Sequence, residues 1–152
     1  MFRGTAARRD NHQVAEPPDP ADLADAIWNR AAVDGGGPRP HYGDAALSAV
    51  LRLHGLAMSG GLLDAVERVA DPELDAAEHG YAWLGHPDAA RLIAYIRDQI
   101  RVGALQDADR GDQLEDEANQ RYADIIGTAD TLYTAFCRRL AAEPSAFASA
   151  GD

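Results

Sequence analysis

The segment from Ala45 to Val69 constrains the fold of this chain most strongly, because two apolar helical patterns meet in it at a pair of glycines. On both sides of the break, apolar residues recur at intervals of three and four, which is the spacing of one helix face. Ser59 is expected to cap the second helix, and Gly60 and Gly61 allow backbone angles that other residues resist. We therefore predict a helix–corner–helix core whose corner consists of Ser59, Gly60, Gly61 and Leu62.

Signals for helix starts recur along the chain. Asp19-Pro20 and Asp71-Pro72 each place a capping side chain before a proline that suits the first helical turn. Asp44 is expected to cap the helix that precedes the corner. The apolar pattern lapses from Gly103 to Asp112, so we expect an acidic loop there. Because no segment shows the alternation of a β-strand, the sequence predicts an all-α fold, a single compact domain of six or seven helices.

The length of 152 residues fits one domain, which we place at residues 19–148. Residues 1–18 are polar and contain two adjacent prolines, so they are expected to form a flexible tail, with residues 149–152 as a second short tail. No apolar run reaches the roughly 20 residues that cross a membrane, and the N-terminus lacks the apolar stretch of a signal peptide. We therefore expect a cytoplasmic protein without membrane contact.

The net charge of −11 is concentrated in the middle of the chain. Residues 64–130 contain sixteen acidic residues and six arginines, whereas the flanking regions are close to neutral. Direct binding to nucleic acid requires a positive surface and is therefore disfavoured. The charge distribution instead favours a basic protein as the partner.

Two groups of carboxylates are candidates for a partner-binding face. The predicted third and fourth helices carry Asp64, Glu67, Asp71, Glu73, Asp75 and Glu78. The expected acidic loop and the start of the next helix carry Asp107, Asp109, Asp112, Glu115, Asp116 and Glu117. Fixed on rigid helices, such charges would attract a basic DNA-binding protein, and salt would weaken the attraction. The alternative is that the acids only keep the surface soluble, with Glu115 to Glu117 favourably placed at a helix N-terminus.

One cluster has the spacing of a metal site. Asp75, Glu78 and His79 stand at i, i+3 and i+4 of one helix, and His86 follows shortly after. Carboxylates and imidazoles in this spacing can surround a metal ion. A second histidine at helical spacing is missing, however, so the pattern completes no zinc motif. We favour a solvated acidic face and predict no metal and no cofactor.

The remaining reactive side chains point to structural roles. Cys137 lies on the core side of the last predicted helix, where a free cysteine behaves as a small hydrophobe. Arg138 and Arg139 follow it directly, but no histidine that could act as a base stands near it in the sequence. His54 is expected to be a core or boundary histidine, and His41 with Tyr42 to pack at a helix cap. No nucleophile motif occurs, so we predict that the chain is not an enzyme.

The corner resembles a known family. Leu56-Ala57-Met58-Ser59-Gly60-Gly61-Leu62-Leu63 is similar to the Asn-Gly-Gly-Phe corner of the DNA-mimic protein family, small acidic all-helical bacterial proteins. The stretch from Leu114 through Tyr122 to Phe147 resembles that family's C-terminal helices, so the similarity spans residues 44–148. Ser59 and Leu62 stand where the family has asparagine and an aromatic residue. The resemblance implies a protein that imitates DNA by its surface charge and occupies a DNA-binding regulator.

These observations predict a non-enzymatic acidic protein-interaction module, a DNA mimic that sequesters a basic transcription factor or nucleoid protein. Two alternatives remain open from the residues alone. One is an immunity or antitoxin-like inhibitor of a specific enzyme, which would also need acids. The other is a metal-dependent enzyme built on the cluster that begins at Asp75. A homodimer through an exposed helix face is also left open.

Overall fold

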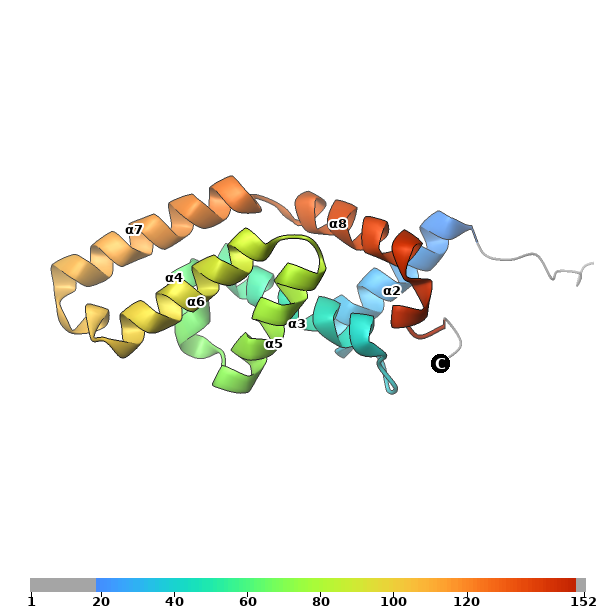
Figure 1. Cartoon of the computed structure of the whole chain (residues 1–152), viewed down its shortest axis with the longest axis horizontal. Coiled ribbons are helices and arrows are strands. Elements are labelled where there is room, and N and C mark those ends of the chain that lie inside the picture. The colour runs from blue at the N-terminus through green and yellow to red at the C-terminus, as the bar shows by residue number, and fades with distance from the viewer. Residues whose placement is uncertain (1–18, 150–152) are drawn as a thin grey trace, which may run out of the picture.

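The computed structural model describes residues 19–149, and within this range the chain forms α-helices and short 3-10 helices but no strand. The elements are α2 (Pro20–Asp34), α3 (Tyr42–Gly60), α4 (Leu62–Arg68), α5 (Asp71–Trp83), α6 (Pro87–Arg101), η1 (Ala104–Gln106), α7 (Ala108–Ile125), α8 (Ala129–Ala142) and η2 (Pro144–Ala146). Figure 1 shows their arrangement. The predicted all-α class with six or seven helices is confirmed.

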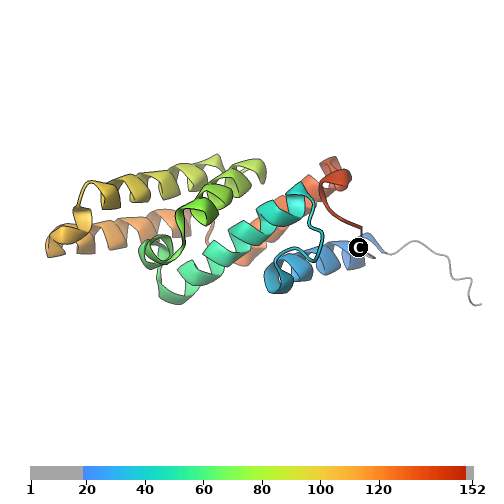
Figure 2. The ribbon, with the colours of Figure 1, turned by 90° about the horizontal axis from the view of Figure 1, so that it is seen from below.

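Helix α3 lies at the centre of the molecule, with α2, α4 and α5 packed against it. On the other side of α5 lies α6, and α7 runs back along α6 (Figure 1). Figure 2 shows α6 and α7 side by side, with α3 crossing the middle of the molecule. Helix α8 returns the chain to α2. Among the described helices, none combines the length and apolar character that crossing a bilayer would require.

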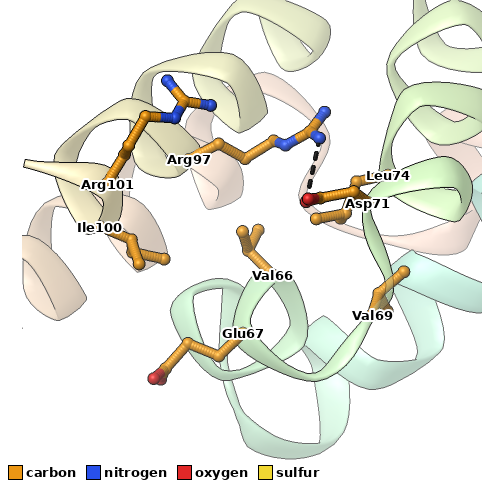
Figure 3. A pocket seen from close by; sticks show the side chains of 8 residues that line it. All are labelled: Val66, Glu67, Val69, Asp71, Leu74, Arg97, Ile100 and Arg101. Atoms are coloured by element: carbon orange, nitrogen blue, oxygen red, sulfur yellow. Dashed lines mark hydrogen bonds and ion pairs between the residues drawn. The ribbon is translucent and has the colours of Figure 1, made fainter.

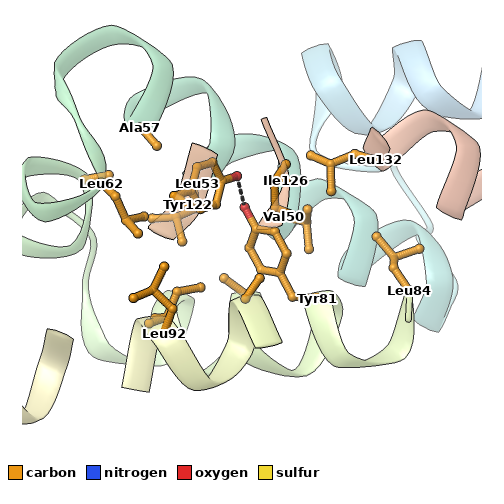
Figure 4. Close-up of a cluster of buried hydrophobic side chains, with 14 of the residues drawn as sticks. Val50, Leu53, Ala57, Leu62, Tyr81, Leu84, Leu92, Tyr122, Ile126 and Leu132 are labelled. Carbon is orange, nitrogen blue, oxygen red and sulfur yellow. Dashed lines mark hydrogen bonds between the residues drawn. The ribbon is translucent and has the colours of Figure 1, made fainter. Parts of the chain in front are cut away.

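One buried cluster joins these helices into a single compact domain. Leu53 of α3, Leu62 of α4, Tyr81 of α5, Leu92 of α6 and Tyr122 of α7 are all at most 2% exposed. Figure 4 shows these side chains converging between the helices. The apolar stripes read from the sequence therefore face one common core, because burying apolar surface is the main favourable term in folding.

The predicted corner exists, but it lies at Gly61 alone. Helix α3 continues through Ser59 and Gly60, so Ser59 does not cap the next helix as expected. Gly61 ends α3 and starts α4 with φ at +93°, in a region that favours glycine. Its backbone N–H still bonds to the carbonyl of Ala57, so the last turn of α3 is complete at this residue. Leu62 is the first residue of α4 and is buried.

Two other helix starts differ from the prediction by a few residues. His41, not Asp44, is the N-cap of α3, and the Asp44 carboxylate reaches back to the backbone N–H of His41. The proline of Asp71-Pro72 lies in the first turn of α5 as expected, but the cap residue is Ala70. In both places the carboxylate lies inside the first turn, where its negative charge also interacts favourably with the positive end of the helix dipole.

The expected acidic loop from Gly103 to Asp112 is largely helical. After the short η1 helix, Asp107 caps α7, and its carboxylate accepts hydrogen bonds from the N–H groups of Asp109 (2.9 Å) and Arg110 (3.3 Å). Helix α7 therefore begins six residues before Leu114, and Glu115 to Glu117 lie beyond its first turn. The apolar pattern is weak here because few side chains of this end of α7 are buried.

Helices α3 and α5 approach closely at Gly80, which sequence patterns did not identify. A Cβ atom at Gly80 would lie 2.7 Å from the carbonyl oxygen of Ala46 and 2.7 Å from a methyl group of Val50. Only glycine leaves room for this backbone contact. The predicted tail 1–18 and residues 150–152 lie outside the described residues. Ser149 is described, and its carbonyl accepts a hydrogen bond from Arg30 (3.2 Å).

Candidate functional site

Three of the predicted interface acids surround one arginine. The guanidinium of Arg97 on α6 donates hydrogen bonds to Glu78 (2.7 Å), Asp75 (2.8 Å) and Asp71 (3.2 Å), all from α5. The Arg97 side chain is only 14% exposed. Burial alone would lower its pKa, but the hydrogen bonds to the three carboxylates outweigh burial and raise it, so Arg97 stays charged. These acids therefore hold α5 to α6 and are partly neutralised.

A pocket of about 370 Å³ opens beside this arginine, between α4, α5 and α6 (Figure 3). Its polar wall consists of Glu67, Asp71, Arg97 and Arg101. Arg97 is engaged as described, and Arg101 pairs with Asp98 one turn before it. Because both cations already have carboxylate partners, the pocket offers no free positive charge to an anionic ligand.

Three further predicted acids also have an arginine partner. Asp64 lies 3.1 Å from Arg68, Glu73 lies 3.7 Å from Arg52, and Glu117 lies 3.4 Å from Arg121. Glu117 also accepts a hydrogen bond from the hydroxyl of Tyr95 (3.0 Å). Each of these ion pairs is largely exposed and is worth about 0–1 kcal/mol. Together with the Arg97 cluster, they pair half of the twelve predicted interface acids with arginine.

The other half are exposed, and within residues 19–149 none of them lies within 4 Å of an arginine guanidinium. One of them is Glu67 on α4. The remaining five occupy the cap and first half of α7, and we refer to them as the α7 acidic face: Asp107, Asp109, Asp112, Glu115 and Asp116. The structure therefore divides the candidates in a new way: the four acids of α5 are bound to arginine, whereas the five acids of the α7 acidic face are exposed and have no arginine partner among the described residues.

The α7 acidic face has a charge density close to that of a nucleic-acid strand. Nine residues of helical rise from Asp107 to Asp116 span about 14 Å. Five carboxylates and Arg110 within that length leave four net negative charges, or about one per 3.4 Å. A single DNA strand also carries one charge per about 3.4 Å of helix axis. A helix can hold this density because five carboxylates share its exposed surface and one of them caps its N-terminus.

The residues of the alternative metal cluster are not brought together. The carboxylates of Asp75 and Glu78 both accept hydrogen bonds from Arg97, and the ring of His79 lies 2.9 Å from the backbone oxygen of Asp75. His86 is the N-cap of α6, and burial, with a further contribution from Arg138, lowers the pKa of its ring. Among the described residues, no group of three metal-ligating side chains could hold an ion.

His54 belongs to a buried hydrogen-bonded chain that the sequence did not reveal. Its Nδ1 lies 2.7 Å from the hydroxyl of Tyr122, which lies 2.6 Å from the hydroxyl of Tyr81. All three residues are at most 6% exposed (Figure 4 shows the two tyrosines). The expected core position of His54 agrees with this burial. For Tyr81 and Tyr122, the sequence pattern indicated only that they lie on apolar helix faces. Sequence spacing could not show that three separate helices bring these groups together.

Cys137 and the pair His41-Tyr42 have structural surroundings. Cys137 is half-buried and lines an apolar groove of about 560 Å³ between α2 and α8, beside Tyr133 and Leu140. His41 caps α3 and contacts the backbone oxygen of Ser145 (3.3 Å). Tyr42 is 60% exposed and packs edge-on against Trp83.

Compared with known protein families, curated proteins and solved structures, this chain has no match. The resemblance of its corner to the DNA-mimic family therefore stays a prediction. Function has to be inferred from the geometry of the surface.

Proposed function

We propose that this chain is a non-enzymatic protein-interaction module that binds a basic protein through the α7 acidic face. One observation carries the proposal: these five carboxylates are exposed at the start of one helix and have no arginine partner among the described residues, whereas six of the other predicted interface acids do. Unpaired charges held at fixed positions give a persistent negative potential that steers a cationic partner.

The partner class that fits best is a DNA-binding protein. Its binding surface is built to meet phosphates at their regular spacing, and the α7 acidic face carries about one net charge per 3.4 Å of its length. The resemblance of the corner to the DNA-mimic family supports the same class. A transcription factor or nucleoid protein held in this way would lose its access to DNA.

Two triple variants with the same net charge test this proposal. The α7 variant combines Asp112→Asn, Glu115→Gln and Asp116→Asn, whereas the matched variant combines Asp64→Asn, Asp88→Asn and Asp98→Asn, whose carboxylates are each paired with an arginine one turn away. Both change the net charge from −11 to −8. Each immobilised protein is exposed to an extract of the native cell, and bound proteins are eluted as salt rises from about 50 mM to about 500 mM.

We expect the native protein and the matched variant to retain the same basic DNA-binding proteins, to release them as salt rises, and to compete with duplex DNA for each purified partner. The α7 variant should lose this capture. Equal retention by the α7 variant, or retention that is insensitive to salt, would contradict the proposal. Capture of an enzyme without DNA-binding activity by the same residues would instead assign the inhibitor class.

A further inference from the structure

A small pocket lies beside the α7 acidic face, where the α3–α4 corner meets α7. Its volume is about 230 Å³, and its walls include Ala57, Met58, Leu62, Asn119 and Ala123. Met58 is 53% exposed, although it follows the buried Ala57 directly in α3. An exposed methionine at the edge of a pocket is suited to binding, because its flexible, polarisable side chain adapts to apolar groups.

The pocket and the acids share one side of α7. Asp112, Glu115, Asn119 and Ala123 are spaced at i, i+3, i+7 and i+11, so they form a single stripe along the helix. The last two residues line the pocket and the first two are acids without an arginine partner among residues 19–149. Between Glu115 and Asn119 the helix rises only about 6 Å. One short segment of a partner can therefore meet both features.

Asn119 holds the pocket in place. Its side-chain oxygen accepts a hydrogen bond from the backbone N–H of Leu62 (3.1 Å), immediately after the glycine of the corner. This bond satisfies one of the free N–H groups at the start of α4. It also ties the corner to α7, so the walls of the pocket on the two sides are fixed relative to each other.

The size of the pocket indicates one side chain as its occupant. Sites for small molecules usually enclose about 300–1,000 Å³, which is more than this pocket offers. Interfaces between proteins are commonly dominated by one or a few apolar or aromatic side chains that fill such pockets, surrounded by polar contacts.

We propose that this pocket receives one aromatic side chain of the basic partner, while arginine or lysine residues of the same segment meet Asp112 and Glu115. This inference rests on the proposed function and adds a requirement to it. Charge alone would select any cationic segment, whereas the pocket selects one in which an aromatic residue stands within a turn or two of basic residues. Any DNA-binding protein can meet the acidic charges, but only one with a suitably placed aromatic residue can also fill the pocket. The pocket would therefore let this protein discriminate among DNA-binding proteins.

Two synthetic peptides test the inference. The first is an arginine-rich peptide of roughly 14 residues with one central tryptophan, flanked by arginines three and four residues away on both sides. Its twin has alanine in place of the tryptophan. Affinities for the native protein are measured at low salt by fluorescence anisotropy of labelled peptides. The sequence has only two methionines, Met1 and Met58, so labelling the methionine methyl groups with carbon-13 gives one reporter in the pocket and one internal reference.

We expect the tryptophan peptide to bind about tenfold more tightly than its twin and to shift the methyl signal of Met58 but not that of Met1. Ala123→Trp, which fills the pocket from an exposed position, should reduce the affinity to that of the twin. Gln120→Trp on the outer face of α7 is the control and should leave the difference intact.

Equal affinities of the two peptides, with the Met58 signal unmoved, would overturn this inference and leave the proposed function standing. Insensitivity to Ala123→Trp would overturn it in the same way. If neither peptide binds at low salt, or if Asp112→Asn with Glu115→Gln leaves binding of both unchanged, the proposed function fails and the pocket proposal fails with it.

Discussion

Asp44 shows that not every acid of this acidic protein serves the surface. Its side chain is fully buried and lies 3.0 Å from the guanidinium of Arg30. The other carboxylate oxygen accepts hydrogen bonds from the backbone N–H groups of His41 (2.9 Å) and Ala148 (2.7 Å). Arg30 in turn donates to the carbonyl of Ala148 (2.9 Å). One ion pair thus holds the start of α3, the helix α2 and the C-terminal segment together.

Replacing this carboxylate should therefore cost far more than replacing an exposed one. Asp44→Asn leaves Arg30 without its countercharge in a mostly buried position, and we expect the free energy of unfolding to fall by about 3 kcal/mol. Asp88→Asn, which breaks the exposed pair with Arg91, should cost less than about 1 kcal/mol. Urea unfolding of the two variants measures both values. Similar losses for the two would show that the buried pair has no special weight.

His54 gives the stability of the protein a defined dependence on pH. Burial lowers the pKa of its ring, and neutral His54 can accept a hydrogen bond from Tyr122 at Nδ1. Burial also raises the pKa of Tyr81 and of Tyr122, so both hydroxyls remain protonated at neutral pH. Tyr81 can then donate to Tyr122, and Tyr122 to Nδ1 of His54, so each hydroxyl has a partner for its proton.

The sign of the pH effect follows from this neutral state. The pKa of His54 is lower in the folded protein than the ordinary value of about 6.5. As the pH falls through that value, the unfolded chain therefore binds more protons than the folded protein does. The free energy of unfolding decreases as a result. Between about pH 7.5 and about pH 5, the native protein should lose more stability than His54→Gln. The pKa of His86 is lowered too, so only the difference between the two proteins reports His54. Equal losses would contradict the prediction.

At the scale of elements, the packing of α3 on α5 depends on a glycine that helix propensity alone would disfavour. Gly80 lies in the interior of α5, where the carbonyl of Ala46 comes close enough to exclude a side chain. In an ordinary exposed helix, a change from glycine to alanine would stabilise the helix by about 1 kcal/mol. The close contact reverses that expectation, because the two helices would have to separate.

A pair of substitutions measures this reversal. Gly80→Ala should destabilise the protein by about 1–3 kcal/mol, the usual cost of overpacking. Gly55→Ala in α3 is the control, because no atom beyond the surrounding turns of its own helix lies within 4 Å of the added Cβ, and it should stabilise the protein by about 0.5–1 kcal/mol. Thermal and urea unfolding distinguish the two signs. A gain in stability for both variants would show that α3 and α5 tolerate a wider separation.

Helix α7 is the element that sequence patterns described least well. Leu114, Ala118 and Tyr122 are its buried residues, and their spacing of four places them on one face of the helix. The first turn lacks such residues and was therefore expected to be a loop. A capping carboxylate at Asp107 and the helix dipole stabilise that turn in place of apolar packing. The difference matters for function, because Asp109 and Asp112 lie on α7 and Asp107 caps it, whereas the sequence pattern placed these three acids on a loop.

At the scale of the whole molecule, the remaining negative charge should oppose folding. A net charge far from zero destabilises a compact state by self-repulsion, and the unpaired acids of α7 concentrate part of it. Raising sodium chloride from about 50 mM to about 500 mM should therefore raise the melting temperature of the native protein by a few degrees. The α7 variant should show a smaller rise. The matched variant should keep at least the native rise. Its substitutions remove three attractive ion pairs that salt would otherwise weaken, and they leave the repulsion among the α7 acids in place. Equal responses of both variants would contradict this account.

The sequence by itself determined the helical class, the position of the corner to within two residues, and the existence of apolar helix faces on both sides of it, because these follow from spacing along one helix. It also located the surplus of acids. Only the tertiary structure decided which acids are available. Arg97 meets Asp71, Asp75 and Glu78 from another helix, and no spacing within one segment predicts an ion pair between segments. The pocket at Met58 and Ala123 arises in the same way, because its walls become neighbours only when the α3–α4 corner packs against α7.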